Sequence, residues 1–307
     1  MIRLKSAVLI GICVFGASSG VAFGQAPKWS DEREINQLTE HVYRFGLRHP
    51  RYGMHNGMFV VTPEGIIVMD GICENMDWLK SELQTRFKMP VKYVVLSHDH
   101  QSHLCDTQVF ADTAIGIGNV NIRPHIVRDK RRSIVPQVLF EDTMEIELGG
   151  VRVVLFHLGP THSDNMIYVH VPSEGVLFAP DFARGKNILP DFRDLEINNA
   201  LKALRTLASW PDVKMVLDGH DRSTTTQQAF LDFHRYLLAM RDRVLERIVA
   251  GKPLTEIRKE VTMADFKDYN QSPARVLVHV DTTYDYLWRQ REPTVGGPQM
   301  PVRAPRD

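Results

Sequence analysis

The stretch Val94-Val95-Leu96-Ser97-His98-Asp99-His100-Gln101-Ser102-His103 decides the fold. In it, an apolar run rich in valine ends in three histidines within six residues. A buried strand followed by a polar, ligand-rich tip is how a rigid scaffold presents a metal site. Residues two apart in a strand point to the same side, so His98 and His100 can aim at one ion, and His103 can turn towards the same ion or a neighbouring one. Imidazole suits zinc and other borderline divalent metals, so the stretch predicts a metal site.

Three further stretches repeat the pattern of an apolar run that ends in a potential metal ligand. They are Gly159–Asn165, which contains His162, Phe178–Asp181, and Val216–His220. Because each ligand comes directly after an apolar run, all of them can converge at one edge of the core. A site built from separated strand ends is held by the fold itself, which favours preorganised catalysis.

The order of apolar runs and turns predicts two packed sheets with helices outside. Strand, hairpin and helix patterns over residues 41–87 lead into the buried strand at 91–96, and a second block of hairpins covers 145–179. Helical patterns follow at 195–208, 224–248, 254–261 and 282–288. No linker divides this region, so we expect one domain over 41–290 that includes a C-terminal helical extension.

Together the four motifs resemble the metallo-β-lactamase superfamily, which has the α/β fold of an αββα four-layer sandwich with a metal site at one sheet edge. The family's H-x-H-x-D-H motif corresponds to residues 98–103, and it is followed in order by a Gly-x-x-His, a strand-end Asp and a late Gly-His. The resemblance covers roughly Val42 to His220.

The resemblance implies a ligand set for two metal ions. His98, His100 and His162 would hold the first ion, His103 and His220 would contribute to the second, and Asp181 would bridge the two and orient the attacking hydroxide. Zinc, as one or two ions, is the expected metal. Asn165 is a candidate contact for the oxyanion, and His55 and Asn56 are candidates for lining the substrate cleft.

One position departs from the family pattern. Ser102 stands where the family has the aspartate between its second and third histidines. A neutral hydroxyl is a poor zinc ligand beside carboxylate or imidazole. The first metal site is therefore complete in the sequence, whereas the second lacks its most distinctive ligand.

The resemblance implies a metal-dependent hydrolase that uses a metal-activated hydroxide on a small ester, lactone, thioester, amide or β-lactam. Ser102 and the long C-terminal helical segment favour the broader superfamily over antibiotic hydrolysis. One alternative is an oxidoreductase similar to the sulfur dioxygenases of the superfamily, with a single iron held by His98, His162 and Asp181. The other is a non-catalytic, metal-binding relative.

The first 24 residues match a signal peptide. Arg3 and Lys5 precede the apolar run Ala7–Phe15, and Ala22-Phe23-Gly24 fits a cleavage site, which predicts export to the periplasm. The apolar run is too short for stable membrane insertion. We expect a loosely held lead-in at 25–40 and a disordered tail at 291–307, which is rich in Pro, Gly and charge.

The composition excludes some classes of partner and leaves one question on cysteine pairing. Lys and Arg number 37, as do Asp and Glu, so nothing calls for a nucleic-acid partner, and a small-molecule substrate is expected. Cys73 and Cys105 remain beyond the signal segment. We expect free or buried thiols, although an oxidising compartment would permit a bridge. The oligomeric state is left open.

Overall fold

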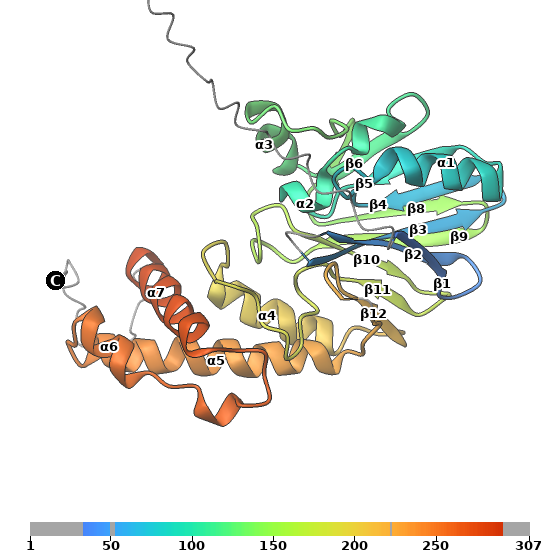
Figure 1. Ribbon diagram of the computed structural model, residues 1–307. Helices are drawn as coiled ribbons and strands as arrows, with labels where there is room; N and C mark the ends of the chain where they lie inside the picture. Colours follow the sequence, from blue (N-terminus) through green and yellow to red (C-terminus); the bar gives the residue numbers. More distant parts are fainter. Residues whose placement is uncertain (1–32, 50–52, 222, 291–307) are drawn as a thin grey trace, which may run out of the picture.

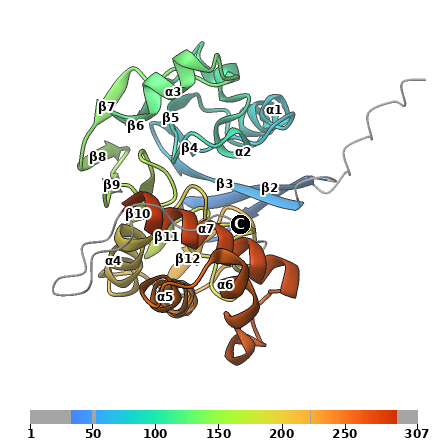
Figure 2. The same ribbon diagram turned by 90° about the vertical axis from the view of Figure 1, so that its left-hand side faces the viewer.

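Two mixed β-sheets pack face to face between two layers of helices in the computed structural model, which describes residues 33–49, 53–221 and 223–290 (Figure 1). Helices α1 and α3 cover the outer face of the first sheet, and α4 lies on the outer side of the second, with α5 beyond it and α6 and α7 packed near one end of α5 (Figures 1 and 2). This is the αββα sandwich with a C-terminal helical region that the sequence predicts.

The first sheet runs in the order of the sequence. Its members, antiparallel up to β4 and parallel from there on, are β1 (Arg33–Gln37), β2 (Val42–His49), β3 (Gly53–Thr62), β4 (Gly65–Met69), β5 (Val91–Val95), β6 (Ile115–Asn119) and β7 (Val138–Phe140). The parallel half requires crossovers, and helix α1 (Met76–Phe87) provides the one between β4 and β5.

The second sheet has the order β12-β11-β10-β9-β8, and only β11 and β12 are parallel. Its strands are β8 (Thr143–Leu148), β9 (Val151–His157), β10 (Ile167–Val171), β11 (Val176–Phe178) and β12 (Met215–Leu217). Helix α4 (Ile197–Ala208) connects β11 to β12.

Short helices follow the strands of the first sheet, and longer ones follow the second. The short ones are α2 (Gln101–Leu104), the 3-10 helix η1 (Thr107–Phe110) and α3 (Ile122–Arg128). After β12 come α5 (Gln228–Val249), α6 (Leu254–Glu260), the 3-10 helix η2 (Ala264–Phe266) and α7 (Pro273–Gln290).

Strand alternation divides the core into three layers. In β4, Ile67 and Met69 face the space between the sheets, whereas Ile66 and Val68 face α1. In the same way, Tyr168 of β10 faces the C-terminal helices while its neighbours face the sheet interface. Both faces of each sheet are thus buried, which explains why the central strands read as continuous apolar runs rather than as alternating ones.

The N-terminal part of the described chain differs from the expectation of a loosely held lead-in at 25–40. Residues Arg33–Gln37 form β1, which pairs with β2 in antiparallel register. Its sequence, Arg-Glu-Ile-Asn-Gln, is polar because this edge strand is only partly buried, so it carries no apolar signal. The expected signal peptide at 1–24 and the expected tail at 291–307 lie outside the described residues. Within the described part, no helix has the length and apolarity needed to span a membrane.

Candidate metal centre

Four chain segments that follow strands meet at one edge of the sandwich. His98 comes three residues after β5, His162 lies between β9 and β10, and Asp181 and His220 each come three residues after β11 and β12. Backbone hydrogen bonds join the two sheets at this edge: Ile167 N donates to Ser97 O at 2.8 Å, and Asn56 N donates to Gly219 O at 2.7 Å. The strand ends therefore hold the predicted ligands in a fixed relation.

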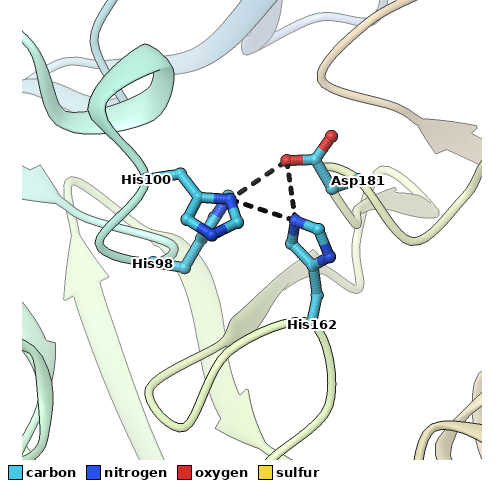
Figure 3. A group of neighbouring side chains, drawn as sticks. All are labelled: His98, His100, His162 and Asp181. Atoms are coloured by element: carbon cyan, nitrogen blue, oxygen red, sulfur yellow. Dashed lines mark hydrogen bonds and ion pairs between the residues drawn. The ribbon is translucent and has the colours of Figure 1, made fainter. Parts of the chain in front are cut away.

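The first group of potential ligands contains His98, His100, His162 and Asp181, with one donor atom of each within 4.8 Å of all the others. Their side chains point towards one another (Figure 3). Asp181 Oδ2 lies 3.3 Å from His98 Nε2 and 3.4 Å from His162 Nε2, and the latter is 3.1 Å from His100 Nδ1. Three imidazole nitrogens and one carboxylate oxygen thus surround one point.

The second group contains His103, Asp181 and His220. The Nε2 atoms of His103 and His220 are 3.1 Å apart, and each lies close to Asp181, at 3.1 Å from Oδ2 and 2.7 Å from Oδ1, respectively. Asp181 is the member that the two groups share. Its Oδ2 lies near histidines of both groups, and its Oδ1 lies near His220.

Hydrogen bonds fix the orientation of the second group's histidines. His103 Nδ1 lies 3.1 Å from Asp70 Oδ2, and His220 Nδ1 lies 3.0 Å from the Met54 carbonyl, which leaves both Nε2 atoms facing Asp181. Carboxylate and carbonyl partners of this kind orient metal-binding histidines and raise their basicity. Gly219 permits the close approach, since a Cβ atom there would lie 2.6 Å from His103 Cε1.

Asp70 is a buried support for this arrangement. Besides His103, its carboxylate accepts hydrogen bonds from Ser97 N and Ser97 Oγ, both at 2.7 Å. Ser97 Oγ in turn lies 2.9 Å from His98 Nδ1. One carboxylate at the end of β4 therefore connects to a histidine in each group.

Asp181 adopts a left-handed backbone conformation, with φ at 58°. For a residue other than glycine this conformation costs roughly 1–3 kcal/mol and is typical of functional positions. Asp218 compensates for it: its Oδ1 accepts the Asp181 N–H at 3.1 Å, and its Oδ2 pairs with Arg184 Nη1 at 2.6 Å.

The protonation states favour cation binding at the first group, whereas His103 in the second group carries a proton. Burial lowers the pKa of His98, and burial together with His162 lowers the pKa of His100 to about 4, so both are neutral at pH 7. Burial also opposes charge on His103, but the carboxylates of Asp181 and Asp70 outweigh it and raise its pKa to about 10. A metal ion at this position would displace that proton.

The donor set fits a divalent metal ion. His98 Nε2 is fully buried and has no hydrogen-bond partner among the described residues, although a buried polar atom normally has one. An ion coordinated by this nitrogen would satisfy it. The nitrogen and carboxylate donors suit zinc, and they also suit iron.

The remaining predicted site residues lie beside the cluster rather than in it. Asn165 is fully buried, and its amide donates to Asp99 Oδ1 at 3.0 Å and to Asp164 Oδ1 at 2.7 Å. This position does not support an oxyanion contact, because both amide hydrogens already have partners. In the sequence Asn165 stands three residues after His162, but the direction of its side chain depends on the conformation of the loop.

His55 and Asn56 on β3 also lie behind the reactive groups. The His55 ring packs edge to face on the His220 ring with centroids 4.4 Å apart, and Asn56 donates to the carbonyls of Asp218 and Asp221. Neither lines the pocket described next, so the expectation that they form the substrate cleft is replaced by a supporting role for the His220 loop.

Cys73 and Cys105 form a disulfide, which corrects the expectation of free thiols. Cys73 follows Asp70 by three residues and Cys105 follows His103 by two, and their Cα atoms are 4.8 Å apart. The pairing could not be read from spacing, because it depends on where the loop after β4 meets α2. It links the two segments that carry Asp70 and His103.

A pocket of about 560 Å³ opens over both groups of ligands. His100, His162, Asp181 and His220 form its floor, with Ser102 beside them. The rest of the lining includes residues that the sequence analysis does not single out, namely Arg184, Leu189, Pro190, Asp191, Asp194, Leu195, Asn270 and Arg275. Of these residues, only Arg184 could have been predicted from the sequence to lie near the site, because it comes three residues after Asp181. The others belong to segments without a motif.

Three solved structures illustrate the similarity in fold, and two of them are named metallo-β-lactamases. The metallo-beta-lactamase from Pontibacter korlensis has 20% sequence identity and a TM-score of 0.62, and the alignment covers 67% of this chain and 99% of that one. VMB-1 has 19% identity and a TM-score of 0.60 over 68% and 97%. Metallo-beta-lactamase IND-7 has 18% identity and a TM-score of 0.57 over 67% and 99%.

No protein-family model matches the sequence, and no curated protein matches it either. The structural similarity nevertheless shows the metallo-β-lactamase fold, and the His/Asp cluster at its sheet edge has the donor atoms that a divalent metal ion requires. About a third of this chain lies beyond what those structures share with it.

Proposed function

We propose that the protein is an exported, metal-dependent hydrolase that acts on a small ester, lactone, thioester, amide or β-lactam. The observation that carries the proposal is the pair of ligand groups that share Asp181 at the floor of one pocket. Small-molecule sites are typically such concave pockets, with a few convergent polar groups.

His98, His100, His162 and Asp181 would hold one zinc ion, and His103, Asp181 and His220 a second. Zinc supplies Lewis acidity and lowers the pKa of a coordinated water to about 7. The chain's own contribution is positioning: Asp70, Ser97 and the Met54 carbonyl orient the imidazoles, and Asp218 fixes the carboxylate.

The state of the second ion depends on Ser102. The hydroxyl lies at the pocket where the superfamily motif has a carboxylate, so the second group is left with two imidazoles and the shared Asp181. We infer a tightly held first ion and a weaker second ion, because a hydroxyl replaces an anionic ligand there.

A mononuclear iron oxidoreductase is the second candidate. His98, His162 and Asp181 provide two histidines and one carboxylate, which is the ligand set of many non-haem iron sites. The second group of ligands, which this chemistry does not need, supports the hydrolase instead. A β-lactam substrate has support from the names of two structural neighbours, whereas Ser102 favours other carbonyl substrates.

Export to the periplasm is part of the proposal. Its support is the signal-like sequence at 1–24, which lies outside the described residues, and the Cys73–Cys105 disulfide. Disulfides persist in oxidising compartments and are rare in the cytosol.

Metal analysis of the purified protein, combined with hydrolysis assays, tests the proposal. We expect zinc at one or two ions per chain, and ester or lactone turnover that a chelator abolishes and zinc restores. His98→Ala should remove the first ion and the activity, and His220→Ala should lower occupancy of the second. His234→Ala is the matched control, since this half-buried histidine lies on α5, outside both ligand groups. A single iron per chain without hydrolysis would favour the oxidoreductase, and full metal content without any turnover would favour a non-catalytic relative.

A further inference from the structure

Most of the pocket lining other than the ligands comes from two segments that are distant in sequence. One is the stretch between β11 and α4, and the other includes Asn270 and the first turn of α7. Hydrogen bonds join them: Asn270 N donates to Lys186 O at 2.8 Å, and Asn270 Nδ2 donates to Asn187 Oδ1 at 2.9 Å. In Figure 2, α7 lies in front of the second sheet. The C-terminal helical region thus supplies part of the pocket.

Two arginines line this pocket, and in the described part of the chain only one of them is paired with a carboxylate. Arg184 is nearly buried and paired, with Nη1 at 2.6 Å from Asp218 Oδ2 and Nε donating to Asn187 O. Its positive charge is therefore neutralised by a carboxylate that also supports Asp181. Arg184 has little capacity left for a substrate anion.

Arg275, by contrast, is held in place without being neutralised. Its Nη1 donates to Asn270 O at 2.8 Å and to Ile188 O at 3.4 Å, both of which are uncharged backbone carbonyls. Among the described residues, its guanidinium forms no ion pair. Nε and Nη2 remain without a partner there, and they form one edge of the guanidinium fork, which suits bidentate contact with a carboxylate.

The two acidic residues near Arg275 in the pocket lining have other neighbours. Asp191 accepts hydrogen bonds from Arg193, with Nη2 at 2.9 Å, and Asp194 Oδ2 lies 3.5 Å from His100 Nε2. Neither is paired with Arg275. Arg275 therefore adds to the lining of the pocket that holds the metal ligands a positive charge with no carboxylate partner among the described residues.

We propose that Arg275 determines substrate class by binding a carboxylate of the substrate, so that the preferred substrates are small carbonyl compounds with a carboxylate set apart from the bond that is cleaved. The proposal rests on the proposed hydrolase function for its reaction, but the anion site itself is independent of turnover. A charge-assisted, bidentate contact of this kind changes binding by about tenfold or more.

Two matched esters test the proposal with the zinc-loaded protein. 4-Nitrophenyl hydrogen adipate carries a free carboxylate, and 4-nitrophenyl methyl adipate is its neutral counterpart. We expect kcat/KM for the charged ester to exceed that for the neutral one by about tenfold, and Arg275→Gln to bring the ratio close to one, mainly through KM. Arg275→Lys, which keeps the charge but not the fork, should fall between. Arg289→Gln is the control on the same helix, since Arg289 pairs with Asp285 outside the pocket.

Binding of a non-hydrolysed pair separates this proposal from the hydrolase proposal. Calorimetric titration with 6-oxoheptanoic acid and with its neutral counterpart 2-heptanone, neither of which has an acyl bond to cleave, should show tighter binding of the acid to the wild type, and loss of that difference in Arg275→Gln. If neither ester is hydrolysed while the acid still binds through Arg275, the hydrolase proposal fails and the anion site stands. If the esters are hydrolysed with equal preference, or if Arg275→Gln keeps the preference for the acid, the anion site is wrong and the hydrolase stands.

Discussion

The backbone N–H of Asp181 donates a hydrogen bond to Asp218 Oδ1, 3.1 Å away. This bond supports the left-handed backbone conformation of Asp181, the residue whose carboxylate both ligand groups share. Asp218 follows β12 directly and Asp181 comes three residues after β11, so the parallel pairing of these two strands brings the residues together. The carboxylate of Asp218 also pairs with Arg184 and neutralises its charge. The position of the residue that both ligand groups share therefore depends on a residue that belongs to neither.

Asp218→Asn should destabilise the protein and weaken metal binding together. The amide keeps one acceptor but removes the charge that pairs with the nearly buried Arg184, and loss of one partner of a buried pair costs about 3–5 kcal/mol. Loss of an outer partner of a metal ligand usually lowers affinity by about 10–100-fold. Urea unfolding and zinc titration measure the two effects. Asp242→Asn, at an exposed ion pair with Arg241, should change neither. Wild-type zinc affinity in Asp218→Asn would contradict this reading of the hydrogen bond.

Ser102→Asp should strengthen the second metal site. The new carboxylate would join two imidazoles and the shared Asp181, so we expect the affinity for the second ion to rise by about tenfold or more, with little change in the first. Zinc titration with a competing chelator measures both. Gln101→Asp, one residue away and exposed, adds the same charge without lining the pocket and is the control. Equal effects of the two substitutions would indicate a general electrostatic effect and not coordination.

Removal of the disulfide should lower stability. The bridge closes a loop between residues separated by 32 positions, and loops of this size usually contribute about 2–4 kcal/mol through the unfolded state. The double variant Cys73→Ser, Cys105→Ser should unfold at a lower urea concentration than the oxidised wild type. A reducing agent should shift the wild type to the same midpoint and leave the variant unchanged. A wild-type midpoint that does not respond to the reductant would show that the thiols are unpaired in solution.

Acid should destabilise the C-terminal helices through His279. This ring is stacked on Phe192, its Nε2 donates to Leu189 O at 2.9 Å, and its Nδ1 accepts from the Tyr236 hydroxyl at 2.9 Å. Burial, opposed only in part by the hydrogen bond to Leu189, lowers the pKa of His279 to about 4. The unfolded chain therefore binds a proton near pH 6.5 that the folded chain does not.

The sign follows from that difference. The free energy of unfolding is highest above pH 6.5, falls as the pH drops from 6.5 towards 4, and loses about 3 kcal/mol in total through this residue. Urea unfolding of the metal-free protein at a series of pH values measures it, and His279→Gln should have a flatter profile over this window. An unchanged slope in the variant would exclude His279 as the source.

The sequence predicts most of the fold because the central strands are buried on both faces and are continuous in apolar residues. Val94 and Val95 of β5 are an example, since they face opposite core layers. The edge strand β1 escapes prediction for the opposite reason, since its residues are polar and only partly buried. The predicted ligands come together because each lies in a segment that follows a strand, and the strand ends set the places of these segments.

The supporting residues were harder to predict because their roles depend on tertiary contacts. Asn165 turns to Asp99, and Asn56 turns to the loop of His220, although both stand beside motif residues in the sequence. No sequence motif surrounds Arg275, and its place in the pocket follows only from the tertiary packing of α7. Likewise, the sequence spacing of Cys73 and Cys105 does not predict that their loops lie close enough to form a disulfide.

The division of ligands between the two sheets has a consequence for folding. His98, His100 and His103 follow a strand of the first sheet, whereas His162, Asp181 and His220 belong to the second. A bound ion would therefore act as a cross-link between the halves of the sandwich, and its binding free energy would add to the stability of their interface. Neither half of the sandwich holds a complete ligand group by itself. The free energy of unfolding would therefore rise with the concentration of free metal ion.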